Sequence, residues 1–245
     1  MSIYLALGRR QLGKTTLVYS MARKCPARLI LDPRGLIHSD GLRVSRLEDL
    51  ELMMDRMSVT ASTKKDALSE IIVTPDTNVQ TMFDQCARHV KAWAQDFQHA
   101  PRATHRLMFV VDEARFFDLR ESAAFEYVLR AAPPDLVNIA ITAHRPVDIP
   151  TDIRAISDHW LMFRCTQEHD LKVIGERTTE TVRDAVARLN PHEFIDWDDA
   201  TATARPFKNP AAWYLPLRST NAPEMTDPDI LPAAEVGKVD KPKLF

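Results

Sequence analysis

Short apolar runs alternate along the chain with longer stretches in which apolar residues recur every three or four positions. Runs without a polar interruption predict strands buried on both faces, and the recurring pattern predicts amphipathic helices. We therefore expect an α/β protein with a mainly parallel sheet flanked by helices. The predicted strands are 3–7, 28–31, 71–73, 107–111, 137–141 and 160–163, and the predicted helices are 15–24, 47–57, 79–97 and 122–130.

The alternating pattern continues beyond these elements and stops at about residue 218. Helices are expected within 167–188, and short strands near Phe194 and Trp213, so that residues 1–218 form one domain. From about Ser219 onward the chain has prolines at 223, 228, 232 and 242, mixed charges and almost no periodicity. Such a composition predicts an extended tail over 219–245 that becomes ordered only against a neighbour.

Composition narrows the class of protein. The 245 residues carry a formal net charge of −2, which excludes a wholly basic nucleic-acid coat but not a local basic channel. The three cysteines lie far apart, without the spacing of a zinc site or a disulfide framework. No apolar run reaches the roughly 18 residues that a membrane span needs, and the N-terminus lacks a signal peptide. We expect a soluble protein in the cytoplasm.

A phosphate-binding loop is the first motif that carries chemistry. The run Gly8-Arg9-Arg10-Gln11-Leu12-Gly13-Lys14-Thr15 fits G-x4-G-K-[ST] between a predicted strand and a predicted helix. Backbone N–H groups of such a loop and of the helix start point at a chain of phosphates. Lys14 is expected to reach the β- and γ-phosphates, and the Thr15 hydroxyl to bind Mg²⁺. The predicted nucleotide-binding residues are Gly8, Arg9, Arg10, Gln11, Leu12, Gly13, Lys14, Thr15 and Thr16.

Two acidic residues follow the apolar run 107–111. Asp112 and Glu113 are expected at the carboxyl edge of the sheet, where open α/β sheets bind their ligands. Asp112 would hold the hydrated Mg²⁺, and Glu113 would orient and deprotonate the attacking water. A third motif, residues 142–146 (Thr-Ala-His-Arg-Pro), ends another strand, and His144 is its candidate sensor of the γ-phosphate.

Together these motifs resemble the FtsK/HerA superfamily of DNA-pumping ATPases over about residues 1–200. Within it the chain is most similar to the genome-packaging ATPases of tailless icosahedral viruses with an internal membrane. The resemblance implies a three-layer P-loop NTPase core of the additional-strand, RecA-like type, with the sensor strand between the phosphate-loop strand and the Asp-Glu strand. It also implies ATP and Mg²⁺ as cofactors, double-stranded DNA as the partner, a ring that the family suggests is a hexamer, and docking to a capsid vertex or a membrane-associated viral protein. Location in the host cytoplasm or on the virion follows from the same resemblance.

The sequence departs from the family pattern at two places. His144 stands where the family usually has glutamine, and it can still donate a hydrogen bond, now with a pH dependence. Family members often carry Gly-Arg about a dozen residues before the sensor tip, as a candidate arginine finger that acts on the adjacent subunit. Ala132-Pro133 occupies that place, so Arg130 becomes the candidate finger, with Arg154 and Arg120 as rivals.

The leading hypothesis is ATP hydrolysis coupled to translocation of double-stranded DNA into a preformed viral capsid. A second hypothesis is an assembly or secretion ATPase similar to the zonula occludens toxin-like proteins of filamentous phages. A third is a nucleotide-dependent scaffold that does not hydrolyse, although Glu113 argues against it. A fourth is a small-molecule P-loop kinase, for which no lid is evident in the sequence.

Overall fold

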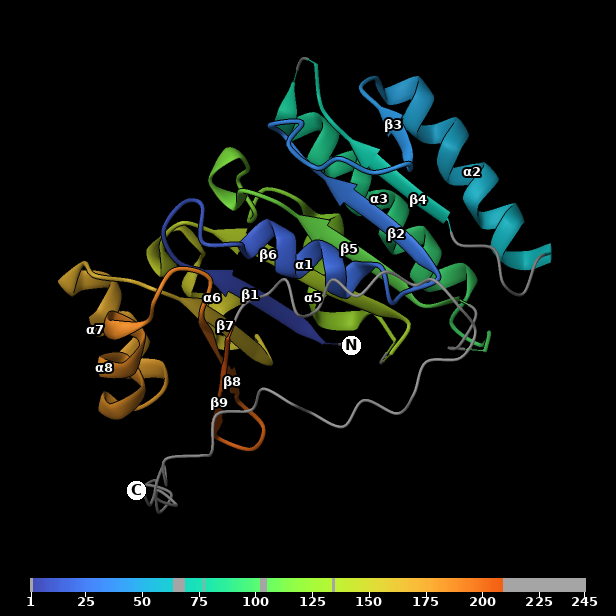
Figure 1. The fold of residues 1–245 in the computed structure, drawn as a ribbon. Coiled ribbons are helices and arrows are strands. Elements are labelled where there is room, and N and C mark those ends of the chain that lie inside the picture. The colour runs from blue at the N-terminus through green and yellow to red at the C-terminus, as the bar shows by residue number, and fades with distance from the viewer. Residues whose placement is uncertain (1, 64–68, 77, 102–104, 134, 209–245) are drawn as a thin grey trace, which may run out of the picture.

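The computed structural model describes residues 2–63, 69–76, 78–101, 105–133 and 135–208. Their strands form one sheet in the order β3-β4-β2-β5-β6-β1-β7-β8-β9, with helices on both faces (Figure 1). The α/β class and the largely parallel sheet predicted from the sequence are confirmed. The strands are β1 (Ile3–Leu7), β2 (Ala27–Leu31), β3 (Leu42–Val44), β4 (Ser69–Val73), β5 (Leu107–Val111), β6 (Val137–Ala143), β7 (His159–Phe163), β8 (Phe194–Asp198) and β9 (Thr203–Phe207).

The strand order places β6 between β1 and β5, which is the position predicted for the sensor strand. The three strands are parallel, and their register pairs Leu7 with Ala143 and Val111 with Ile141. On the other side of β5, Leu31 of β2 pairs with Val111. The carboxyl ends of β1, β2, β5 and β6 therefore meet at one edge of the sheet, which brings together residues distant in the sequence.

Successive side chains of each strand point to opposite faces of the sheet, and each face has its own core. Ile30 and Val110 belong to the core under α1, whereas Leu29 and Phe109 belong to the core under α2, α3 and α5. Figure 1 shows α1 on the near face and α3 and α5 behind the sheet. The helices are α1 (Lys14–Ala22), α2 (Leu47–Thr63), α3 (Val79–Asp96), α5 (Ala123–Ala131), α6 (Thr151–Ala155), α7 (Glu168–Arg177) and α8 (Glu180–Arg188), and the short 3-10 turns are η1 (Ala114–Phe116) and η2 (Pro146–Asp148).

Two short strands were not anticipated from the sequence. β3 has only three residues, of which Leu42 and Arg43 are exposed, so no alternation marks it. β9 contains Pro206 and pairs antiparallel with β8 as the last strand of the sheet, a position that tolerates proline. The helix predicted over 47–57 extends to Thr63, and Ala61 packs against the core four residues after the buried Met57.

The end of the chain is described only in part. β8 confirms the strand predicted near Phe194, whereas Trp213 and the predicted tail 219–245 lie outside the described residues. The helices predicted within 167–188 are α7 and α8. In the described part of the chain, every helix is too short or too polar to cross a membrane.

Candidate active site

The phosphate loop joins β1 to α1 and requires glycine at both of its ends. Gly8 has φ 138° and Gly13 has φ 97°, backbone conformations that other residues rarely adopt. A Cβ atom at Gly8 would also lie 2.7 Å from the Cβ of Phe163 on the neighbouring β7. α1 begins at Lys14, directly after Gly13, so the positive end of the helix lies at the loop. This is the geometry in which a P-loop binds phosphate.

Lys14 is almost fully buried at the base of this loop. Its Nζ donates a hydrogen bond to the Arg9 carbonyl oxygen at 2.8 Å and lies 3.5 Å from Nδ1 of His144. Burial lowers the pKa of Lys14, because the charged ammonium loses its hydration there, while Glu113 and Asp112 act in the opposite direction. A phosphate chain in the loop would bring negative charge next to this ammonium and so stabilise its charged form.

Asp112 meets two threonine hydroxyls at the end of β5. Its Oδ1 accepts hydrogen bonds from Thr15 Oγ1 at 2.9 Å and from Thr142 Oγ1 at 2.7 Å. The other oxygen, Oδ2, is buried and has no hydrogen-bond partner among the described residues. Burial raises the pKa of Asp112, and the two threonine bonds oppose that shift.

These observations fit a hard divalent cation. A buried carboxylate oxygen without a partner is costly, and Mg²⁺ is bound through carboxylate and hydroxyl oxygens next to phosphates. Asp112 and Thr15, the two predicted ligands, lie within hydrogen-bonding distance of each other. No group of three or more His, Cys, Asp or Glu that could hold a metal is found among the described residues, so such a cation would need the phosphates and water as further ligands.

Glu113 is held in a left-handed backbone conformation, with φ 56°, immediately after β5. Its backbone N–H donates to Thr142 Oγ1 at 2.9 Å, which fixes the turn. Its Oε1 lies 3.1 Å from Arg34 Nη1, and its Oε2 lies 2.8 Å from His144 Nε2 and 3.4 Å from Arg115 Nε. The carboxylate is thus oriented by three side chains from three segments of the chain.

His144 follows β6 and lies between the lysine and the glutamate. Nε2 faces Glu113 and Nδ1 faces Lys14, so the ring bridges the two predicted functional groups. Burial and the nearby Lys14 charge lower the pKa of His144, in that order, whereas Glu113 opposes the shift. The neutral imidazole is therefore favoured at neutral pH. The side chain of Arg10 also lies close, with Nε 3.3 Å from His144 Nε2.

The three arginines considered as fingers have partners other than the residues of the site. Arg130 is half-exposed at the end of α5, with Nε 3.4 Å from Glu126 and Nη2 4.0 Å from Asp152. Arg120 makes a closer ion pair with the same Asp152, at 3.0 Å. Arg154 bonds Thr151 within α6. None of the three makes a contact with Lys14, Glu113 or His144 in the described structure, so none completes the site of its own subunit there.

Three residues of the site were not singled out by the sequence: Arg115, which lies 3.4 Å from Glu113, Thr142 and Arg34. Thr142 binds both Asp112 and the Glu113 backbone, and its only signal was its place in the Thr-Ala-His-Arg-Pro run. Arg34 belongs to the turn Asp32-Pro33-Arg34 after β2, and its only signal was its place at a polar strand end. Arg145, in contrast, turns away: its Nε lies 3.1 Å from the buried Asp170 of α7.

Solved structures provide the comparison. The genome-packaging NTPase B204 from Sulfolobus turreted icosahedral virus 2, in complex with ATP-gammaS, matches with a TM-score of 0.65 and 16% identity, over 85% of this chain and 97% of that one. The DNA-packaging ATPase B204 from Sulfolobus turreted icosahedral virus matches with a TM-score of 0.61 and 17% identity over the same shares. This chain has the fold of the genome-packaging NTPases.

The bacterial conjugative coupling protein TrwB is more distant, with a TM-score of 0.52 and 7% identity over 84% of each chain. These likenesses show a shared fold, which agrees with the three-layer P-loop core that the motifs led us to expect. No family model and no curated protein matches the sequence. The likeness in fold covers most of both chains.

Proposed function

We propose that this protein is an ATP-hydrolysing motor that translocates double-stranded DNA and packages a viral genome into a preformed capsid. The observation that carries the proposal is the position of Glu113. Its carboxylate lies beside His144, which in turn contacts Lys14, and it directly follows Asp112, which contacts Thr15. A carboxylate next to the phosphate loop but not needed for the cation can serve as the base for a water molecule.

Each residue then has a distinct role in hydrolysis. Lys14 offsets charge on the β- and γ-phosphates, and Thr15 and Asp112 hold Mg²⁺ and its water shell. The bound Mg²⁺ supplies electrostatic stabilisation of the phosphate oxygens. Glu113 orients the attacking water and accepts its proton. The His144 N–H, which faces Glu113 in this structure, would turn to donate a hydrogen bond to the γ-phosphate when ATP is bound. Residues Gly8 to Thr16 form the nucleotide-binding loop and helix start, with ATP as the nucleotide.

The coupling to DNA is supported by the fold. The structures that share it over most of their length include a DNA-packaging ATPase. In this proposal the subunits form a ring, a hexamer, around the duplex, and an arginine from the adjacent subunit completes each site. Arg130 is the candidate because it ends α5 close to where the family carries its arginine, is half-exposed, and contacts only Glu126 and Asp152 among the described residues. A capsid vertex or a membrane-associated viral protein would anchor the ring.

The decisive experiment is the rate of ATP hydrolysis with and without double-stranded DNA. We expect strong stimulation by duplexes of unrelated sequence, together with binding that weakens steeply as salt rises, because the contacts go to phosphates. Lys14→Ala provides the control for contaminating activity. Hydrolysis that does not respond to DNA would support an assembly or secretion ATPase instead, and no hydrolysis would support a nucleotide-dependent scaffold.

A further inference from the structure

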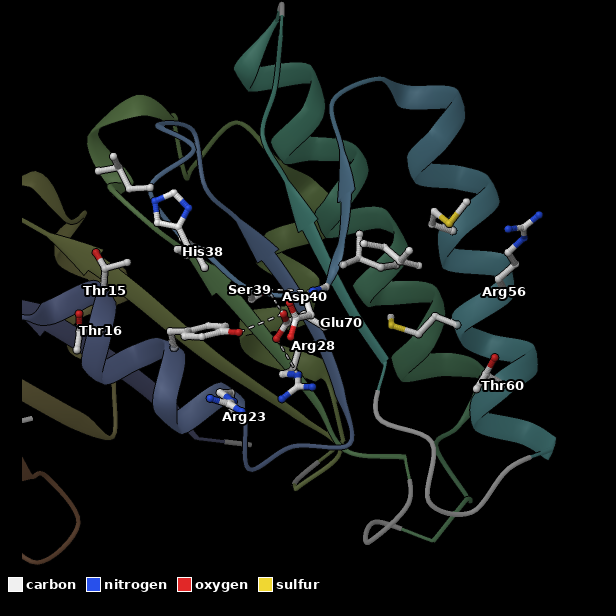
Figure 2. A pocket seen from close by; sticks show the side chains of 18 residues that line it. Thr15, Thr16, Arg23, Arg28, His38, Ser39, Asp40, Arg56, Thr60 and Glu70 are labelled. Carbon is white, nitrogen blue, oxygen red and sulfur yellow. Dashed lines mark hydrogen bonds and ion pairs between the residues drawn. The ribbon is translucent and has the colours of Figure 1, made fainter. Parts of the chain in front are cut away.

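A pocket of about 880 Å³ opens beside α1, on the face of the sheet that α1 covers only in part. The sheet continues past α1 to β4 and β3, and α2 forms the far wall (Figure 2). Thr15 and Thr16, at the start of α1, line one end, so the pocket adjoins the phosphate site. The pocket is therefore a concave surface beside the nucleotide that the hydrolysis mechanism does not use.

The floor of the pocket is a buried ion pair. Arg28 of β2 is 7% exposed, and its Nε lies 3.1 Å from Glu70 Oε2 on β4. The other Glu70 oxygen accepts from the Tyr19 hydroxyl at 3.2 Å and from Ser39 Oγ. The Glu70 carboxylate therefore has several partners. Arg28, in contrast, has no other ion pair or side-chain hydrogen bond among the described residues. Its Nε is close to Glu70, but the two groups are not aligned for a hydrogen bond. A buried guanidinium with spare donors favours an anionic partner.

Two further arginines stand on either side of this floor. Arg23 comes from α1 and Arg56 from α2, and Figure 2 shows them to the left and right of Glu70. Neither forms an ion pair within the part of the chain that the structure describes. With Arg28, they give three guanidinium groups against the two carboxylates of Asp40 and Glu70, so the lining is net positive.

The walls are apolar. Met53 and Met57 of α2 line the pocket, and Leu36 and Leu42 line it with 52% and 55% exposure. A partner that carries both acidic and aliphatic side chains would match this surface. Duplex DNA matches it less well, because a duplex would meet the walls before its phosphates reached the buried Arg28.

We propose that residues 224–231 of this chain, the acidic segment, dock in this pocket. The acidic segment reads Glu-Met-Thr-Asp-Pro-Asp-Ile-Leu, and no lysine or arginine occurs from residue 219 to residue 237. Asp227 and Asp229 pair with Arg23 and Arg28, and Ile230 and Leu231 pack on the methionine and leucine side chains of the walls. This inference does not depend on the proposed DNA motor function.

The chain is long enough to reach. The described residues end at Lys208, next to β9, and Glu224 is 16 positions further on. A fully extended chain of that length spans about 53 to 58 Å. Seven steps in the sheet separate β9 from β4, which is about 34 Å at about 4.8 Å a step. The margin allows the chain to pass around α1, which lies on the same face.

Photo-crosslinking in the full-length protein tests the proposal. We would place p-benzoylphenylalanine at position 230, irradiate, and map the crosslinks by mass spectrometry. The proposal expects crosslinks to the α2 segment that contains Met53 and Met57. Arg23→Glu should lower their yield about fivefold or more, because it replaces an attraction with a repulsion. Asp227→Lys combined with Arg23→Glu should restore part of the yield, and Lys172→Glu, an exposed charge change on α7, should leave it unchanged.

The crosslinks distinguish docking of the acidic segment from DNA binding in the pocket. Crosslinks to other regions, or a yield that ignores these charge changes, would overturn the proposal. If Arg23→Glu weakens duplex binding and no crosslink to α2 forms, the pocket is a DNA site and the proposal is wrong. Irradiation of mixed light- and heavy-isotope subunits shows whether the acidic segment comes from the same chain or from a neighbour, and a specific α2 crosslink of either kind supports docking.

Discussion

Arg34 Nη1 lies 3.1 Å from Glu113 Oε1, so the turn after β2 holds the carboxylate that follows β5. The two residues are 79 positions apart in the sequence. They meet because β2 and β5 are parallel neighbours whose ends are in register, with Leu31 opposite Val111. The turn itself is anchored by Asp32, which is fully buried and accepts hydrogen bonds from the backbone N–H groups of Arg34 and Ile37.

Arg34→Ala should therefore impair hydrolysis without impairing nucleotide binding. The arginine contacts Glu113 but none of the phosphate-loop residues in the described structure, so its loss leaves the carboxylate less well oriented. We expect kcat to fall about 10-fold to 100-fold with an ATP dissociation constant close to that of the wild type. Steady-state kinetics and equilibrium binding of ATP measure the two quantities. Arg34→Lys should recover part of the rate, and a faster Arg34→Ala enzyme would show that Arg34 restrains Glu113 instead.

Glu113→Gln should separate binding from chemistry more sharply. The amide keeps the shape of the side chain but cannot accept the proton of water, so Mg·ATP should bind normally while hydrolysis falls about 100-fold or more. Lys14→Ala is the matched comparison, because it should lose most nucleotide binding as well as hydrolysis. Isothermal titration with a non-hydrolysable ATP analogue distinguishes the two. If the glutamine variant also lost binding, Glu113 would be a metal ligand or a structural residue.

Thr142→Val tests the cation site through a residue that is not one of its predicted ligands. Valine has the same shape but removes the bonds to Asp112 and to the Glu113 backbone, at 2.7 and 2.9 Å. Asp112 should then be less well oriented, so the Mg²⁺ concentration for half-maximal hydrolysis should rise several-fold, by about one order of magnitude at most. A titration of the rate with Mg²⁺ at constant ATP measures this. Thr142→Ser retains the hydroxyl and should behave like the wild type; an equal shift in both variants would contradict the assigned role.

His159 gives a pH-dependent contribution to stability at the far end of the sheet. Its Nδ1 lies 3.1 Å from Asp196 Oδ1, and this hydrogen bond raises the pKa of His159 above its ordinary value, against the effect of burial. The stabilisation is therefore complete below the unfolded-state pKa of about 6.5 and is lost as the pH rises through the higher folded-state pKa.

The expected difference can be measured directly. The free energy of unfolding of the wild type should exceed that of His159→Gln by more at about pH 5.5 than at about pH 9, with the two differences separated by up to about 1 kcal/mol for this partly exposed pair. Urea unfolding at both pH values gives the numbers. Asp196→Asn should show the same pH dependence, and a difference that stays constant with pH would rule out the ion pair as its source.

Arg130→Ala tests the finger proposal. Because Arg130 is half-exposed and contacts only Glu126 and Asp152 among the described residues, ATP binding should be unchanged. If it acts on the adjacent subunit, turnover should fall about 10³-fold or more. Mixed rings of Arg130→Ala and Lys14→Ala subunits should recover activity, since some interfaces then pair an intact Lys14 with an intact Arg130.

The rival arginines supply the control for that experiment. Arg120 shares Asp152 with Arg130, and Arg154 lies on the same α6 helix as Asp152, so all three belong to one surface region. The same mixing experiment with Arg120→Ala and Arg154→Ala should show no defect to complement. If mixed rings containing Arg130→Ala fail to recover, Arg130 does not act across the interface and Arg154 becomes the better candidate.

The phosphate loop, most of the strands and helices, and the Asp112–Glu113 pair could be predicted from the sequence alone. These are local features: Gly13 and Lys14 are adjacent in the chain, and the uninterrupted apolar run 107–111 indicates a strand wherever it lies. The sequence also indicated that polar strand ends would gather at one sheet edge, because parallel strands end together. Even the position of the sensor strand followed from the resemblance of the motifs to a family.

Which side chains meet at that edge depends on how the strands are arranged in the folded protein. Thr142 became a partner of Asp112, and Arg34 a partner of Glu113, through the order β2-β5-β6 and its register, which no short stretch of sequence encodes. The same order left Arg130 beside Asp152 and away from its own phosphate loop. It also left the far side of α1 uncovered, which created the pocket over Arg28 and Glu70. Local patterns fix backbone geometry within a few residues, whereas these contacts depend on strands that pair across large separations in the chain.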